Sequence, residues 1–106
     1  MTDQVRASHI LLAFAGAQNS SAERSREDAL AEIGKLKIQL DEGADFAELA
    51  IAHSDCPSGG QGGDLGDFGR GMIVPEFETA AFGMDIDAVS DVVETAFGYH
   101  LIQRTA

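Results

Sequence analysis

The chain has 106 residues, 44% of them apolar, which is enough to fill the core of one small domain. It carries 18 Asp and Glu against 7 Lys and Arg, a formal net charge of −11. Such a surface repels nucleic acid and anionic membranes, because both are bound through basic patches. The sequence has no long apolar run, so no membrane-spanning helix is expected.

The start of the chain and its cysteine content bear on the cellular compartment. The first residues, Met1-Thr2-Asp3-Gln4, lack the basic and then apolar segments of a secretory signal. The single cysteine, Cys56, cannot form an internal disulfide, which suits a reducing cytosol or leaves the compartment undecided. We expect one domain, residues 1–106, in a cytoplasmic and monomeric protein.

The first half of the chain predicts a strand and then a helix. β-Branched and apolar residues predict a strand over residues 5–14, and small polar residues predict a loop over residues 15–24. Ser25, followed three residues later by Asp28, is typical of a helix N-terminus, and Gly43 is typical of the end of a helix. The apolar stripe of this helix is Ala29, Ile33, Leu36 and Leu40.

The middle of the chain predicts two more helices around a short strand. Asp45 caps a second helix, and the glycine-rich residues 57–63 form a tight loop. Residues 64–70 alternate well enough for a strand, and Pro75 suits the first turn of a third helix. The predicted apolar face of that helix is Phe77, Ala81 and Met84.

The last part of the chain predicts two strands, residues 92–95 and 99–104, joined by a turn at residues 96–98. The sequence shows no internal repeat and no domain boundary. The order of elements is strand, helices, strand, helix, strand, strand. This order predicts an α+β domain in which helices pack on an antiparallel sheet.

Two histidines in strand-like runs are the strongest functional signal. His9 and His100 lie near opposite ends of the chain, and their neighbours two residues away are small or apolar. A buried imidazole needs a polar partner, because an unpaired buried polar group costs roughly 1–3 kcal/mol. If the first and last strands are adjacent, each imidazole can be the partner of the other.

Other residues give weaker signals of a chemical role. The thiol of Cys56 could be a nucleophile if its pKa is lowered, although neither strand histidine is close to it in sequence. His53 falls on the stripe of the second helix, which indicates packing or a helix-end contact. The spacing of these groups matches no compact zinc pattern, so no metal site is expected.

Apolar residues from turns and short elements surround the glycine-rich loop. Individually each is typical of a core, but together they could line a shallow pocket. The residues concerned are Leu65, Ile73, Phe77 and Phe97.

Six stretches of the sequence, taken in order, resemble the parvulin-type peptidyl-prolyl cis/trans isomerases over essentially the full chain. They are Ala-Ser-His-Ile-Leu-Leu (7–12), Asp-Phe-Ala-Glu-Leu-Ala (45–50), Ser-Asp-Cys-Pro-Ser-Gly-Gly (54–60), Gly-Gly-Asp-Leu-Gly-Asp-Phe (62–68), Met-Ile-Val-Pro-Glu-Phe-Glu (72–78) and Phe-Gly-Tyr-His-Leu-Ile (97–102). The resemblance implies a four-stranded antiparallel sheet surrounded by about four helices.

The resemblance also implies roles for individual residues. His9 and His100 are expected side by side on central strands, linked by a hydrogen bond. Thr95 is expected to orient one of them, with Cys56 above the pair. We expect these four residues to form the catalytic centre.

The same resemblance implies a pocket for the proline ring. Its walls are expected to be Leu65, Ile73 and Phe77, with Phe97 at the edge. Many relatives have Met where this chain has Ile73, and Met72 is the adjacent residue. Either side chain could meet the ring, although ungapped alignment favours Ile73.

The implied activity is non-covalent rotation about X-Pro bonds, without a cofactor, in proline-containing peptides and in unfolded or partly folded proteins. A phosphate-binding variant of the family needs a basic cluster after the first strand. Here that loop contains no Lys, and only Arg24 and Arg26 lie at its far end. We therefore expect no strong preference for phosphoserine or phosphothreonine. Two alternatives stay open: a peptide-binding chaperone module with little catalysis, and a thiol enzyme acting through Cys56.

Overall fold

The computed structural model describes residues 4–17, 22–55, 60–73 and 75–106. Its elements are strand β1 (Gln4–Leu12), helices α1 (Arg26–Asp41) and α2 (Phe46–His53), strand β2 (Asp64–Gly69), helix α3 (Pro75–Phe82), and strands β3 (Val93–Thr95) and β4 (Gly98–Arg104). The type and order of the elements predicted from the sequence are confirmed.

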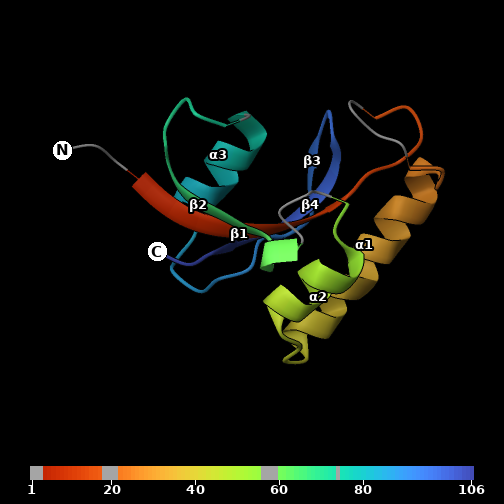
Figure 1. The fold of residues 1–106 in the computed structure, drawn as a ribbon, viewed down its shortest axis with the longest axis horizontal. Coiled ribbons are helices and arrows are strands. Elements are labelled where there is room, and N and C mark those ends of the chain that lie inside the picture. The colour runs from red at the N-terminus through yellow and green to blue at the C-terminus, as the bar shows by residue number, and fades with distance from the viewer. Residues whose placement is uncertain (1–3, 18–21, 56–59, 74) are drawn as a thin grey trace.

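The four strands form one antiparallel sheet in the order β2-β1-β4-β3. The first and last strands of the chain are therefore the two central ones (Figure 1). Positions Ala7 to Leu12 of β1 face Arg104 to Tyr99 of β4. On the other edge, β1 pairs with β2 only from Gln4 to Ser8, and the register shifts between Arg6 and Ser8.

Helices cover both faces of the sheet, with α1 and α2 on one side and α3 on the other (Figure 1). The period of two along β1 and β4 divides the core into two clusters. The larger cluster joins the sheet to α1 and α2 and includes Ile10, Leu12, Ala29, Ile33, Leu36, Phe46, Ala50, Tyr99 and Leu101. The smaller joins the sheet to α3 and consists of Val5, Ala7, Phe68, Phe77, Ala81 and Ile102.

The helix boundaries follow the capping residues of the sequence. The side chain of Ser25 accepts a hydrogen bond from the N–H of Asp28, and that of Asp45 accepts one from the N–H of Glu48. Gly43 has a φ of 101° just beyond the end of α1, which only glycine adopts without strain.

The expected helix count is corrected. The part of the chain that the structure describes contains three α-helices, not about four. The residues themselves carried only three helix signals, at Ser25, Asp45 and Pro75, and the fourth helix came from the family resemblance. None of the helices in the described ranges is long and apolar enough to span a membrane.

Candidate functional site

The pairing of β1 with β4 brings His9 and His100 onto the same face of the sheet. His9 is opposite Ile102, and His100 is opposite Leu11, so the two histidines are diagonal neighbours. Their Nδ1 atoms are 3.1 Å apart, and their ring centroids are 5.2 Å apart with 23° between the planes. The expected hydrogen bond between the imidazoles is present.

A third residue extends this pair into a chain. Thr95 Oγ1 lies 2.7 Å from His100 Nε2. The same hydroxyl oxygen accepts a hydrogen bond from the N–H of Phe97 at 3.2 Å. The expected contact between Thr95 and one histidine is therefore also present.

The hydroxyl of Thr95 helps to decide which groups donate in the row of hydrogen bonds from Thr95 through His100 to His9. With the N–H of Phe97 bonded to its oxygen, the hydroxyl still has one proton to donate, and His100 Nε2 is within reach. If the hydroxyl donates this proton to Nε2, His100 is protonated on Nδ1 and donates to His9 Nδ1. In this arrangement the proton of His9 lies on Nε2, for which no hydrogen-bond partner exists among the described residues.

Both imidazoles are buried and electrically neutral at physiological pH. His9 and His100 are only 6% and 4% exposed. Burial lowers the pKa of His9 from 6.5 to about 4. Burial, together with the neighbouring His9, lowers the pKa of His100 to about 3. The pair can therefore offer hydrogen bonds but holds no positive charge near pH 7.

The ring of Phe77 lies against both imidazoles. Its centroid is 5.5 Å from that of His9 and 5.7 Å from that of His100, with edge-to-face angles of 72° and 87°. Leu65 and Ile73 are partly buried and pack against the core cluster that contains Phe77. Of the predicted pocket residues, Phe77 therefore contacts the histidine pair, and Leu65 and Ile73 pack against the same core cluster as Phe77.

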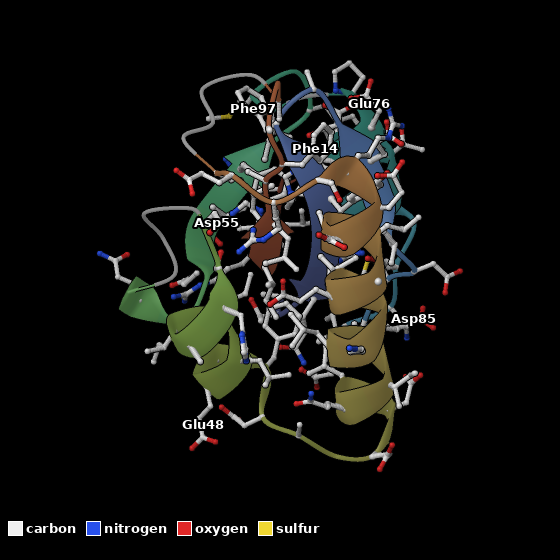
Figure 2. The ribbon with its side chains drawn as sticks, turned by 90° about the vertical axis from the view of Figure 1, so that its right-hand side faces the viewer. Phe14, Glu48, Asp55, Glu76, Asp85 and Phe97 are labelled. Carbon is white, nitrogen blue, oxygen red and sulfur yellow. The ribbon has the colours of Figure 1, made fainter. Side chains whose placement is uncertain are left out.

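The other predicted pocket residues are placed differently. Phe97 is half-buried on the β3–β4 turn and is held to Thr95 through its N–H. It lies at the end of the molecule opposite Glu48 (Figure 2). Met72 is 70% exposed, and its sulfur accepts a hydrogen bond from the N–H of Gly69 at 3.2 Å. Ile73, and not Met72, packs against the cluster of Phe77.

Cys56 lies outside the residues that the structure describes.

His53 does not pack in the core. His53 is exposed in the last turn of α2, so core packing, one of the two roles expected for it, is wrong. It borders a cavity of about 380 Å³ that is also lined by Asp28, Glu32, Lys35 and Leu36 of α1. That cavity involves the helices on the face of the sheet opposite Phe77. Within the described ranges no cluster of His, Cys, Asp or Glu could hold a metal ion.

Three residues that hold the histidine strand were missed by the sequence analysis. Ser54, Asp55 and Gly63 hydrogen-bond to β1 at or near His9. All three lie in stretches that carry the family resemblance, 54–60 and 62–68, but nothing in those stretches indicates β1 as their partner.

Comparison with known proteins decides the family. A family model described as the PPIC-type PPIASE domain matches residues 9–106. The chain belongs to the PPIC-type, or parvulin, family of peptidyl-prolyl cis/trans isomerases. Its parvulin relatives include the "Peptidyl-prolyl cis-trans isomerase Pin1" of Digitalis lanata, 38% identical over 115 residues that cover 98% of each chain.

Solved structures agree with this assignment of the parvulin family. The chain superposes on "Peptidyl-prolyl isomerase ESS1 from Candida albicans" with a TM-score of 0.91 and 33% identity, covering 100% of this chain and 66% of that one. It superposes on the protein titled TbPIN1 with a TM-score of 0.90 and 36% identity, covering 100% of both chains. As a parvulin, the protein is a peptidyl-prolyl cis/trans isomerase.

Proposed function

We propose that this parvulin rotates X-Pro bonds in a site built on the His9–His100 pair and acts on proline-containing segments without strong preference for a phosphorylated residue. Leu65, Ile73 and Phe77 hold the proline ring in this proposal, with Phe97 at the edge. The observation that supports it is the neutral, hydrogen-bonded imidazole pair packed against Phe77.

The chemistry of the reaction suits an apolar site. Rotation about a peptide bond has a barrier of ~18–20 kcal/mol, because the amide loses its resonance when it twists. No covalent bond has to form, so a protein accelerates rotation by binding the twisted form more tightly than either planar form. The twisted amide has less charge separation than the planar one, and a pocket that excludes water favours it.

The imidazoles act in this mechanism as fixed, neutral groups. Their lowered pKa values make proton transfer from an imidazolium near pH 7 unfavourable. We assign them the task of fixing the floor of the site and the polarity around the reacting amide. Thr95 keeps His100 in place through its hydroxyl. Cys56 completes the centre without a covalent step.

The arginines nearest to the loop after β1 support the absence of phosphate selectivity. Arg24 contacts Asp55 at 2.5 Å and Glu32 at 3.5 Å. Arg26 contacts Glu94 at 2.5 Å and donates to the hydroxyl of Tyr99. A phosphate would have to compete with these carboxylates on a chain whose net charge is −11.

We infer that the clients are unfolded or partly folded proteins, and that the protein acts as a cytoplasmic monomer that assists folding. Two relatives carry corresponding names: a "Foldase protein PrsA" of Halalkalibacterium halodurans, 46% identical, and a "Chaperone SurA" of Methylobacillus flagellatus, 42% identical. This chain spans only 26% and 22% of those two proteins. A binding module with little catalysis is the alternative, and the intact His9, Cys56 and His100 argue against it.

The test is a protease-coupled isomerase assay with matched Ser-Pro and phosphoserine-Pro tetrapeptides. We expect clear catalysis of the unphosphorylated peptide and no gain from the phosphate. A gain of about tenfold or more, equivalent to about 1.4 kcal/mol, would overturn the proposed specificity. Binding of the peptide without acceleration of its isomerisation would favour the chaperone module.

A further inference from the structure

The backbone of His9 is held from the outer edge of β1 and not from β4. Backbone N–H and C=O groups of successive strand residues point to opposite edges, so those of His9 and Leu11 share one edge. Paired positions between β1 and β2 end at Ser8. The N–H of His9 instead donates to the carbonyl of Gly63 at 2.9 Å.

The next outward-facing groups of β1 are taken by Ser54 and Asp55. The N–H of Leu11 donates to Ser54 Oγ at 3.1 Å. The N–H of Asp55 donates to the carbonyl of Leu11 at 2.7 Å, and the N–H of Ala13 donates to Asp55 Oδ2 at 2.9 Å. We call Ser54, Asp55 and Gly63 the outer bracket of β1.

Gly63 is in contact with the histidine residue itself. Its φ is 83°, and a Cβ at this position would lie 2.3 Å from the carbonyl oxygen of His9 and 3.2 Å from the Cβ of Ala50. Any side chain at position 63 therefore has to displace either α2 or the backbone of His9. The imidazole would move with the backbone to which it is bonded, and its Nδ1 contact of 3.1 Å to His100 would change.

We propose that the outer bracket positions the catalytic site. Gly63 fixes His9, and Ser54 fixes Leu11 two residues further along β1, so that the two imidazoles meet in one geometry. The inference rests on the proposed role of His9 in catalysis. Residues outside the histidine pair and the proline pocket would then affect turnover through the position of His9. A small displacement of a positioned group can cost up to about a hundredfold in rate.

The first experiment compares Gly63→Ala with Gly43→Ala in the full chain. Both glycines have a positive φ, but a Cβ at Gly43 meets nothing within 4 Å. Both variants carry the backbone strain, and only Gly63→Ala also has the clash. We expect Gly63→Ala to lower kcat by about tenfold or more at unchanged KM, and Gly43→Ala to leave both constants unchanged. The ¹⁵N chemical shifts of the imidazoles are measured in the same samples and should change only in Gly63→Ala.

If Gly63→Ala does not fold, a second pair of variants tests whether the outer bracket positions His9. Ser54→Ala removes the partner of the Leu11 N–H, whereas Ser54→Thr keeps a hydroxyl. We expect Ser54→Ala to shift the imidazole signals and lower kcat, and Ser54→Thr to restore both. Unchanged imidazole signals in folded Ser54→Ala would overturn the positioning role. Changed signals with an unchanged kcat would support the bracket but overturn the catalytic role proposed for His9.

Discussion

The Nδ1 atoms of His9 and His100 lie 3.1 Å apart in a buried part of the molecule. At this distance one nitrogen carries a proton and the other accepts it through its lone pair. If both rings were protonated, two N–H groups would point at each other and two positive charges would be buried together. The pair therefore makes the folded state sensitive to acid.

We predict a specific loss of stability on acidification. Burial lowers the pKa of His9 from 6.5 to about 4 and that of His100 to about 3. Between these values and 6.5 the unfolded chain binds protons that the folded chain does not. The histidines therefore leave stability unaffected well above pH 6.5, and stability falls as the pH decreases from 6.5. For His9 alone the loss reaches about 3 kcal/mol near pH 4, measurable by urea unfolding across this range.

The control is the double variant His9→Leu/His100→Leu, in which this linkage is absent. Acidic side chains titrate in both proteins, so the difference between the two pH profiles reports the histidines. The difference should grow steadily below pH 6.5. Parallel profiles would show that the imidazoles are not buried as neutral groups.

The second prediction concerns Thr95, whose hydroxyl contacts both His100 Nε2 and the N–H of Phe97. Thr95→Val keeps the shape of the side chain but leaves these groups without their partner. We expect a loss of about 1–3 kcal/mol in the free energy of unfolding, with a lower kcat. Thr95→Ser retains the hydroxyl and should keep most of the stability and most of the kcat. An equal kcat for Thr95→Val and Thr95→Ser in the isomerase assay would show that the hydroxyl plays no part in catalysis.

The third prediction separates the proline pocket from the general core. Phe77→Leu and Phe46→Leu both remove a buried ring, from the clusters on opposite faces of the sheet. Both variants should lose stability, and Phe77→Ala should lose about 3–5 kcal/mol, as large truncations in a core do. Only Phe77→Leu should raise KM for the Ser-Pro peptide, because Phe46 is on the other face. A similar rise in both variants would assign the effect to stability alone.

Most helices and strands could be predicted, because the residues that start and end them act on neighbours within a few positions in the sequence. Ser25 and Asp45 satisfy the free N–H groups at the helix starts, and Pro75 fits the first turn of α3. The histidine pair was also predictable, since two buried polar rings on two apolar strands need each other. Their register was not, because a slip of one residue would put the rings on opposite faces.

Residues whose partners lie far away in the sequence were not predicted, because local signals say nothing about distant partners. Gly63 and Ser54 contact β1 across more than forty residues, and nothing near them in the chain indicates that partner. The choice between Met72 and Ile73 depended on the turn before α3. There the sulfur of Met72 bonds to the N–H of Gly69, and Ile73 packs against the core.

The last prediction tests whether the site needs a nucleophile. Rotation about an X-Pro bond forms no covalent bond to the enzyme, so Cys56→Ser and Cys56→Asp should retain substantial activity in the protease-coupled assay. Circular dichroism and urea unfolding establish that each variant is folded before its activity is compared with that of the wild type. A folded variant with no activity at all would reopen covalent catalysis by the thiol. In that case an alkylating substrate analogue should label Cys56 in the wild type, whereas the non-covalent mechanism requires no such labelling.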